Sequence, residues 1–474
     1  DVYQLVRSAV ASLSFHDCVW SAVNVNIVAT SDVDNLSVSF FNCTLLRGSL
    51  WLEVVKLAHL TMFVDDSVFR CDATPAFIPS ILNAIDELKV KGGFLFVVVA
   101  LGSLGNVNVA ISNSIIAVET PAVDGSPLTA VALVFSTPAA DQRIDNIFVR
   151  LNRSRVVANA MNRPPVAISH VLSIIGFKSV DNYEVHLHQE ATLSASASLL
   201  ATATSQTGRS RVMYNRAAVS RAVVALHDRS LIASESGLAC AAGALWLTND
   251  GALRNVRVTL DGGSMVRVTS PIDVDLFAWR APVNVPSSQM NASYVLDGES
   301  SVVVSSGKSA AVFTQISAGD SVTHFVDGFR FALLGGSRFH VTAATDLQLL
   351  AWPLAGTASS LTVNDFTVTV DGRSVINVTG SANTACVLCF IAPSAQLAAA
   401  VILNNVNVTI SGGSAVSLNA STEAQFVSVY AKGAATTGAP AIQLRNVTVD
   451  IASGSTIDAR AVVFVRVVAA RTTA

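Results

Sequence analysis

Hydrophobic and polar residues alternate along most of this chain, and the alternation returns in phrases mostly 34 to 41 residues apart. Each phrase has an Asn, an alternating apolar run, a turn that contains Gly, and a Ser that opens a second run. The phrase is clearest at residues 255–264, 405–414 and 446–455. Alternation of small polar residues with Val and Ile predicts β-strands with one buried face. Self-similarity at this period predicts stacked supersecondary units.

The Ser or Thr that opens each second run serves as an anchor for counting the repeats. Twelve anchors occur, at Thr44, Ser67, Ser114, Ser154, Thr192, Ser230, Ser264, Ser300, Ser337, Ser374, Ser414 and Ser455. Their spacing varies from 23 to 47 residues, which indicates a fixed set of strands joined by loops of different length. The pattern within one repeat predicts three short strands.

Two repeat architectures place strands at this period, the β-propeller and the β-solenoid. Twelve repeats exceed the usual number of propeller blades, and the 23-residue spacing is too short for a four-stranded blade. The chain is therefore predicted to be all-β, a right-handed parallel β-helix (β-solenoid) of about twelve rungs. It is expected to be one continuous solenoid over residues 1–474 and a segment of a larger protein.

One segment has a helical pattern. Ile81, Leu82, Ile85 and Leu88 form an apolar stripe within residues 78–91, and Gly92-Gly93 follows as a stop signal. A helical loop insertion is predicted at residues 75–93.

The recurrent residues have structural roles in this fold. An Asn precedes many anchors by eight to ten residues, at Asn106, Asn146, Asn255, Asn364, Asn405 and Asn446. Stacked side-chain amides at such positions are predicted to hydrogen-bond from turn to turn as a ladder. The Gly residues of the Gly-Gly-Ser sequences at 262, 335 and 412 are predicted to supply the positive φ of a sharp corner.

Composition supports a large core. Apolar residues make up 51% of the chain and charged residues 13%, unlike a disordered protein. The net charge of −3 and the lack of a basic, aromatic-rich patch argue against a nucleic-acid partner. The uncharged stretch 386–403 contains Pro393, so it is predicted to form two buried strands and a loop, not a membrane span.

Eight Asn-x-Ser/Thr sequons mildly favour a glycosylated extracellular protein, although a repeat rich in Asn, Ser and Thr also creates sequons for structural reasons. They lie at Asn35, Asn42, Asn152, Asn291, Asn377, Asn407, Asn419 and Asn446.

Six cysteines are too few for a disulfide scaffold of this length. Cys18, Cys43 and Cys71 lie about one short rung apart and could pair across rungs. Cys386 and Cys389 have the spacing of half a zinc site, but no second pair exists, so buried free thiols are favoured.

Catalytic motifs of β-helical lyases and glycosidases are not evident. Asp65 and Asp66 are adjacent, so on a strand their side chains point to opposite faces. The Asn-Thr-Ala sequence at 383–385 lacks the acid of a galacturonase-like motif, and Arg143-Ile144-Asp145 does not replace it. No catalytic residue and no cofactor are predicted.

A divalent metal site is the best candidate for chemistry. His186, His188 and Glu190 alternate along one strand face, and His227 and Asp228 occupy neighbouring positions one rung later. Imidazole and carboxylate groups within one rung spacing could hold a metal ion. A solvated outer face is the alternative and the favoured interpretation.

The phrase Asn-Val-x-Val-x-Ile-x-Gly-Gly-Ser resembles sequences in the very large repetitive surface proteins of kinetoplastid protists, of the dispersed gene family type, which have pectin-lyase-like β-helical regions. The likeness covers roughly residues 100–470. It implies a glycosylated surface protein with an adhesive role, and it supplies no functional residues. This chain departs from that family in lacking a C-terminal membrane-spanning region.

The expected function is that of a non-enzymatic extracellular or cell-surface β-helix, a rigid stalk or adhesin-like segment. Its expected partners are glycans, host or neighbouring cell surfaces, or copies of itself through uncapped ends. The alternatives are a carbohydrate-active enzyme on the same fold and a structural filament subunit that assembles end to end.

Overall fold

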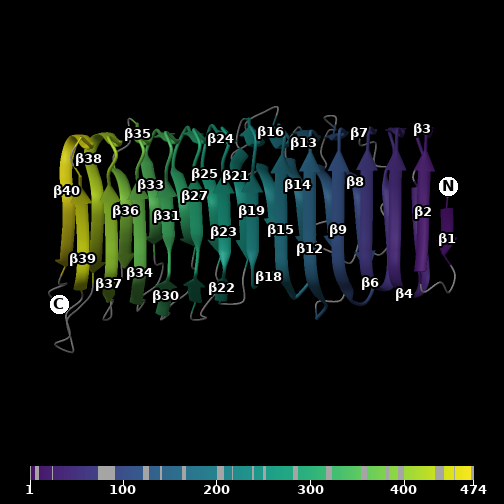
Figure 1. The fold of residues 1–474 in the computed structure, drawn as a ribbon, viewed down its shortest axis with the longest axis horizontal. Helices are drawn as coiled ribbons and strands as arrows, with labels where there is room; N and C mark the ends of the chain where they lie inside the picture. Colours follow the sequence, from purple (N-terminus) through teal and green to yellow (C-terminus); the bar gives the residue numbers. More distant parts are fainter. Residues whose placement is uncertain are drawn as a thin grey trace. The chain divides into compact units, whose positions relative to one another are not determined.

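A computed structural model describes residues 2–5, 10–23, 25–72, 91–120, 128–138, 141–162, 167–199, 208–215, 217–237, 240–248, 252–280, 287–316, 323–353, 360–380, 384–392, 400–432, 442–452 and 454–470. These residues form β-strands and no helix. Each strand pairs in parallel with the equivalent strand of a neighbouring turn, as β9, β12 and β15 do (Figure 1). The predicted all-β parallel β-solenoid is confirmed.

The chain forms two compact units. Unit 1 comprises Asp1–Val219, Leu226–Leu245 and Arg267–Ile272, and unit 2 comprises Ser220–Ala225, Trp246–Val266 and Asp273–Ala474. Strands β19(Ala222–Leu226), β21(Cys240–Thr248) and β24(Met265–Ser270) have residues in both units.

Unit 1 contains three lines of stacked strands, named here by their order around a turn. The first line, before the anchor corner, contains β2(Val10–His16), β9(Leu104–Ser112), β12(Arg143–Asn152), β15(Ser179–His188) and β18(Ala218–Val219). The second line contains β3(Val19–Ser21), β5(Thr44–Leu46), β7(Val68–Asp72), β10(Ile115–Thr120), β13(Arg155–Asn162), β16(Thr192–Leu199) and β20(Leu231–Ser236). The third line contains β1(Val2–Leu5), β8(Lys91–Ala100), β11(Leu128–Ser136), β14(Ala167–Ile175) and β17(Gly208–Asn215). The long strands β4(Val25–Phe41) and β6(Leu50–Asp65) run through the third line and the first.

Unit 2 repeats this arrangement. Its first line contains β22(Ala252–Arg254), β23(Val256–Leu260), β26(Ser287–Met290), β27(Ser293–Leu296), β30(Thr323–Asp327), β31(Arg330–Leu333), β34(Ser360–Val370), β37(Val401–Ile410) and β39(Ile442–Ile451). Its second line contains β28(Ser301–Ser306), β32(Arg338–Ala343) and β35(Val375–Thr379), and its third contains β25(Val274–Arg280), β29(Ala310–Ile316), β33(Asp346–Pro353) and β36(Thr384–Ala392). The strands β38(Ala415–Lys432) and β40(Thr456–Ala470) run through the second line and the third.

Alternation decides which side chains fill the interior. Along β15 the residues Tyr183, Val185 and Leu187 are buried, and the residues between them face outward. Equivalent inward residues stack from turn to turn. In unit 1 the rings of Phe15 and Phe40 stack at 5.1 Å, and in unit 2 those of Phe329 and Phe366 stack at 4.7 Å. Burial of such aliphatic and aromatic columns is the main stabilising contribution.

The anchor serines are inward residues at the corner between the first and second lines. Ser67, Ser114 and Ser154 are each at most 3% exposed. The hydroxyl of Ser114 accepts a hydrogen bond from the N–H of Ser67, and that of Ser154 accepts one from the N–H of Ser114. These hydrogen bonds form a buried ladder along successive corners.

Two anchors predicted from sequence are wrong by one residue. Thr44 lies opposite Val68, and Thr192 lies opposite Arg155, so each belongs to the strand after the corner. Cys43 and Ala191 take the inward position in those turns, at 1% and 0% exposure. A small apolar side chain can therefore occupy this corner position in place of Ser. In these two turns the hydroxyl residue that marks the corner in the sequence is the next residue along the chain.

The predicted corners are confirmed, and the predicted amide ladder is confirmed in part. Asn106 and Asn146 lie within strands and not at a turn, and Asn364 pairs with Asn404, while Asn405 donates to Asp365. Gly262, Gly335 and Gly412 have φ of 59°, 58° and 64°. The amide of Asn146 donates to Asn106, and that of Asn446 donates to Asn405 at 3.0 Å. The oxygens of Asn255 and Asn364 accept from the amides of Asn291 and Asn404 at 3.2 and 2.9 Å.

The predicted helix at residues 78–91 falls almost entirely outside the described residues. Lys91, Gly92 and Gly93 are described, and they begin β8, so the prediction is wrong for the end of the 75–93 insertion. The count of twelve rungs stays a prediction, because gaps in the description interrupt many turns. The uncharged stretch 386–403 contains most of β36 and the start of β37, as predicted, and the predicted loop between them lies outside the described residues. Among the described residues no helix is long and apolar enough to span a membrane.

Candidate functional site

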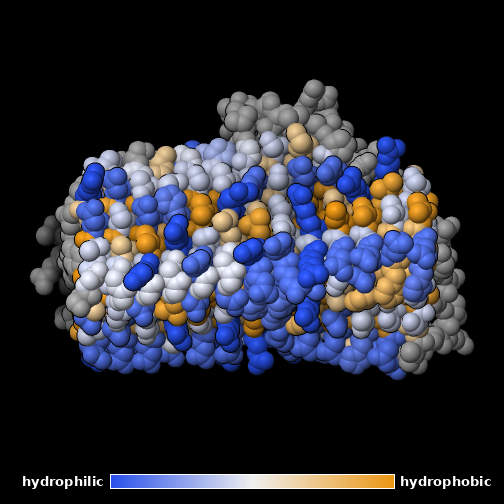
Figure 2. Space-filling model, turned by 45° about the horizontal axis from the view of Figure 1, so that its top comes forward, coloured by the Kyte–Doolittle hydropathy of each residue, from blue (hydrophilic) through white to orange (hydrophobic). Residues whose placement is uncertain are grey.

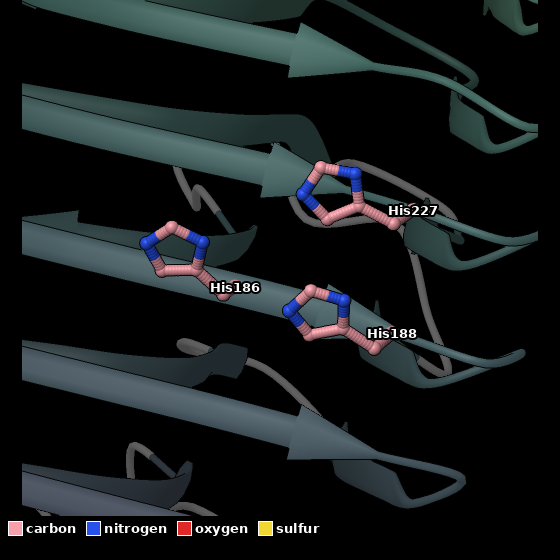
Figure 3. A group of neighbouring side chains, drawn as sticks. All are labelled: His186, His188 and His227. Atoms are coloured by element: carbon pink, nitrogen blue, oxygen red, sulfur yellow. The ribbon is translucent and has the colours of Figure 1, made fainter.

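Three histidines gather on the outer face of unit 1. His186 and His188 alternate with the buried Val185 and Leu187 on β15, so both imidazoles point outward on the same face. His227 belongs to the next turn, where its backbone N–H donates to the carbonyl of Leu187 at 2.9 Å. That backbone hydrogen bond places His227 beside His188 (Figure 3).

The three rings are nearly parallel. The centroids of His186 and His188 are 6.3 Å apart with 5° between the ring planes, and those of His188 and His227 are 4.7 Å apart with 15°. One ring nitrogen from each histidine can be chosen so that all three lie within 4.8 Å of one another. Figure 3 shows the rings grouped around a common gap, with a nitrogen of each on the side of that gap.

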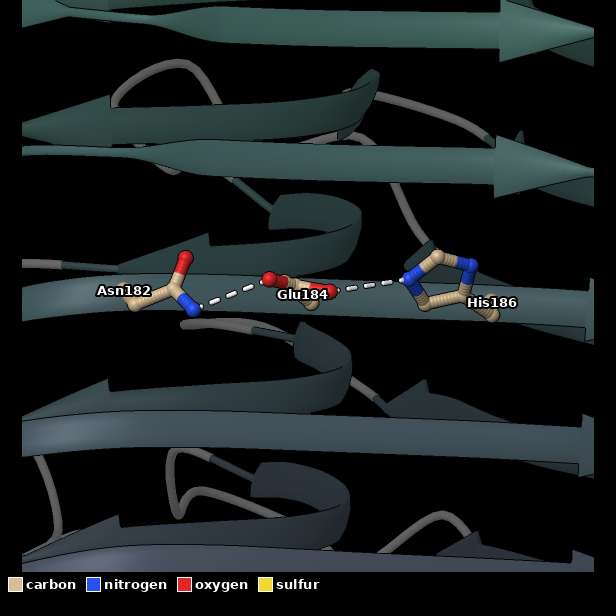
Figure 4. A network of polar contacts seen from close by, with 3 residues as sticks. All are labelled: Asn182, Glu184 and His186. Carbon is tan, nitrogen blue, oxygen red and sulfur yellow. Dashed lines mark hydrogen bonds and ion pairs between the residues drawn. The ribbon is translucent and has the colours of Figure 1, made fainter.

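Neighbouring side chains on β15 and β12 fix the orientation of His186. Its Nε2 lies 3.2 Å from Oε2 of Glu184, and Oε1 of Glu184 accepts a hydrogen bond from the amide of Asn182 at 2.9 Å (Figure 4). The ring of Phe148, on β12, lies 5.2 Å from the His186 ring. With Nε2 held by the carboxylate, Nδ1 is the nitrogen that His186 presents to the other two rings.

The electrostatic surroundings favour the neutral form of His188. Partial burial lowers its pKa, and the nearby His227, Arg150 and His186 lower it further, while Asp228 acts in the opposite direction. A neutral imidazole keeps a lone pair on one ring nitrogen. The central ring of the cluster is therefore in the form that can act as a ligand at neutral pH.

The two predicted carboxylates are not part of the cluster. Glu190 and Asp228 lie at the corners that follow, with φ of 65° and 56°, and the N–H of Glu190 donates to the carbonyl of Asp228 at 2.9 Å. The Glu190 side chain is 73% exposed and lies 4.0 Å from Arg229. The structure thus brings together His186, His188 and His227 and leaves Glu190 and Asp228 outside, because the left-handed corner ends the alternation that the prediction extended to them.

Glu184 was missed by the sequence reasoning. Its position two residues before His186 on an alternating strand was a sufficient signal, since every second residue shares a face. The predicted set of residues began at His186 and continued only towards the C-terminal end of the strand.

A second polar site is a pocket of about 400 Å³ in unit 1. It lies where β4 shifts register against β6 between Ala29 and Asp32. Its lining includes the charged or titratable residues Asp32, Asp34, Lys56, His59, Arg143 and Asp145. Arg143 and Asp145 match no catalytic motif in the sequence, and the register shift beside Asp32 and Asp34 has no clear sequence signal.

The sequons differ in accessibility. Asn35, Asn42, Asn291, Asn407 and Asn446 are exposed, and Asn152, Asn377 and Asn419 are partly buried. The amides of Asn42, Asn291 and Asn446 already donate to side chains of neighbouring turns. The Asn407 side chain is also engaged, since its oxygen accepts a hydrogen bond from the Thr448 hydroxyl at 2.8 Å, so Asn35 is the exposed sequon at which a glycan is best accommodated.

The cysteine predictions are partly wrong. Cys386 and Cys389 are buried as expected, but they form a disulfide and are not free. Both side chains lie in the interior, where they form a cluster with Ala351 of β33. Cys18, Cys43 and Cys71 have no disulfide in the structure. Cys18 and Cys43 occupy equivalent corner positions, since the N–H of Thr44 donates to the carbonyl of Cys18 and that of Val68 donates to Cys43.

Comparison with protein-family models, curated protein sequences and solved structures finds no match to this chain. The fold and the sites described above are therefore the basis for assigning a function.

Proposed function

We propose that this chain is a non-enzymatic extracellular or cell-surface β-helix, right-handed and of about twelve rungs. It acts as a rigid stalk or adhesin-like segment that presents its outer faces and loops to glycans, to cell surfaces or to copies of itself. The resemblance to kinetoplastid surface proteins is part of the same proposal.

The observation that carries the proposal is that the repeated residues are used within the fold. Ser114 and Ser154 hydrogen-bond to backbone groups of neighbouring turns, Gly412 forms a corner, and Asn405 joins an amide ladder. The repeat therefore maintains a regular scaffold, and the outward residues remain for recognition. Figure 2 shows rows of hydrophilic residues across the visible face, as expected of a surface that stays in water.

Two features support an extracellular location. Disulfides such as Cys386–Cys389 form and persist in oxidising compartments. The exposed sequon at Asn35 is compatible with a glycan.

Binding of the secreted protein to cells and to a glycan array tests the adhesin proposal. Saturable binding that falls after enzymatic removal of cell-surface glycans is the expected result. The same protein heated above its unfolding transition is the control. Binding to neither surface, together with turnover of a polysaccharide, would contradict the proposal.

The pocket at the register shift favours a second candidate, a carbohydrate-active enzyme. It gathers the carboxylates of Asp32, Asp34 and Asp145 with Lys56 and Arg143, which are the residue types of acid–base and anion-binding sites. Acidic polysaccharides should be incubated with the protein and assayed for new reducing ends or unsaturated products. Activity that is lost in Asp145→Asn but kept in Glu184→Gln would establish this alternative.

Exposed apolar residues on β39 favour a third candidate, self-association into filaments. Leu444, Val449 and Ile451 are 37% to 44% exposed, whereas their partners Leu403, Val408 and Ile410 are fully buried. Light scattering after size-exclusion chromatography should detect oligomers that dissociate in Val449→Lys. A monomer at high concentration would exclude this candidate.

A further inference from the structure

We propose that His186, His188 and His227 form a binding site for one divalent ion that prefers imidazole ligands, Zn²⁺ or Cu²⁺. The inference is independent of the proposed function. It rests on three imidazoles from two neighbouring turns whose nitrogens lie within 4.8 Å of one another. Nitrogen donors suit these borderline ions, whereas Mg²⁺ and Ca²⁺ prefer oxygen.

A modest closing of the side chains completes the geometry. Ligands at about 2.05 Å from a tetrahedral Zn²⁺ lie about 3.4 Å from each other, so no nitrogen pair has to approach by more than about 1.4 Å. The three side chains are only partly buried, and they lie on an outer face where χ1 and χ2 can rotate. The backbone can stay fixed.

The sheet supplies the rigid part of the site. Parallel strands in neighbouring turns lie about 4.8 Å apart, and residues i and i+2 on a strand share one face. His188 and His227 lie in neighbouring turns, and His186 and His188 lie two residues apart on one face of β15. The resulting triangle is held by the hydrogen bond from the His227 N–H to Leu187, so little order has to be created on binding.

Glu184 provides the supporting hydrogen bond that metal-binding histidines usually have. It accepts from Nε2 of His186 and thereby directs Nδ1 to the gap, and Asn182 fixes the Glu184 carboxylate in turn. A carboxylate in this role orients the ring and increases its basicity as a ligand. Three protein ligands leave a fourth position open to water or to an external group.

Calorimetric titration of the protein with ZnCl₂, without a histidine tag, tests the site. The expected result is one saturable site. His188→Ala and His227→Ala should each weaken binding more than 100-fold, and Glu184→Gln should weaken it less, within the 10- to 100-fold range known for supporting residues. His340→Ala, which removes an outward-facing histidine from β32, is the matched control and should change nothing.

Titration with Co²⁺ provides a second measurement, whose absorption bands report the coordination geometry of the bound ion. Tetrahedral coordination by three imidazoles should give visible absorption bands in the wild type and in His340→Ala, and the bands should be lost in His188→Ala. Circular dichroism confirms that each variant is folded. Unchanged Zn²⁺ binding in a folded His188→Ala, or no saturable binding by the wild type, would overturn the inference.

Discussion

The hydroxyl of Ser114 accepts a hydrogen bond of 3.0 Å from the backbone N–H of Ser67, a residue 47 positions earlier in the chain and one turn away in space. Ser114 is 1% exposed, so no water is at hand to replace the hydroxyl. The relationship joins neighbouring turns through a side chain in addition to the β-ladder.

Ser114→Ala should therefore destabilise the protein. The substitution leaves the buried N–H of Ser67 without its acceptor, at a cost of about 1 to 3 kcal/mol. The measurement is the midpoint of urea unfolding. Ser194→Ala, at an outward position of β16, should change stability by less than about 0.5 kcal/mol. Equal midpoints for the two variants would show that the serine ladder contributes little.

The two glycines of one corner should respond differently to alanine. Both have positive φ, 64° at Gly412 and 72° at Gly413, so both variants lose about 1 kcal/mol to backbone strain. A Cβ on Gly412 would also lie 2.2 Å from Oδ1 of Asp371 and 2.7 Å from the backbone N of Gly372. The nearest atom to a Cβ on Gly413 is 3.9 Å away.

Thermal unfolding can compare the two variants directly. Gly412→Ala should lower the melting temperature more than Gly413→Ala, and the difference reports the crowding of the backbone against the preceding turn. The natural Arg373, in left-handed conformation one turn earlier, shows that the second corner position accepts a side chain. The opposite order of melting temperatures would be inconsistent with the corner geometry.

Acid should weaken the interior of unit 1 through His170. Burial lowers the pKa of this histidine to about 3, with Arg211 and Arg209 adding to the effect, whereas an unfolded histidine has a pKa near 6.5. Between these values the unfolded chain binds one proton more than the folded chain. The free energy of unfolding should then fall by about 1.4 kcal/mol per pH unit as the pH decreases below 6.5.

His170→Phe tests this contribution. The variant keeps an aromatic ring beside Tyr214 and should show a weaker loss of stability between pH 6.5 and 4.5. Between pH 7 and 8.5 the two proteins should change in parallel, which serves as the internal control. His324 in unit 2, with its pKa lowered to about 4 by burial, should add a slope of the same sign in both proteins. Identical slopes at acid pH would argue that His170 is protonated in the folded state.

The cysteines should react as four thiols and one disulfide. Alkylation in denaturant without reductant should label Cys18, Cys43, Cys71 and Cys240, and mass spectrometry should find Cys386 and Cys389 linked. Their separation of three residues makes the linked peptide easy to identify. Two labelled thiols with a Cys18–Cys43 bond would instead indicate pairing across neighbouring corners.

The sequence was sufficient for the fold class, an all-β parallel β-solenoid, because each of its recurring residues has a local cause. Gly262 and Gly412 occupy corners that need positive φ, and the alternation of Val and Ile sets which face is buried. The position of the anchor was less certain at Thr44 and Thr192, since a hydroxyl marks the corner only when it is the inward residue.

The histidine cluster was only half predictable. Alternation placed His186 and His188 on one face, and the repeat placed His227 next to them. The end of the strand was not visible, so Glu190 and Asp228 were included although they lie in the corner. The pocket at Asp32 depends on a register shift between β4 and β6, a relation between two strands that no single stretch of sequence contains.

The equivalence of successive corners has a consequence for how such a gene can change. Ser300 and Ser337 follow glycine-containing corners of the same form, and the strands after them, β28 and β32, pair in register. A recombination event that joins Ser300 directly to Arg338 would delete one whole turn and still leave every inward residue facing inward. Duplication of the same stretch would add a turn. The number of turns can therefore change by one at a time, while the remaining strands keep their pairing partners and their buried faces.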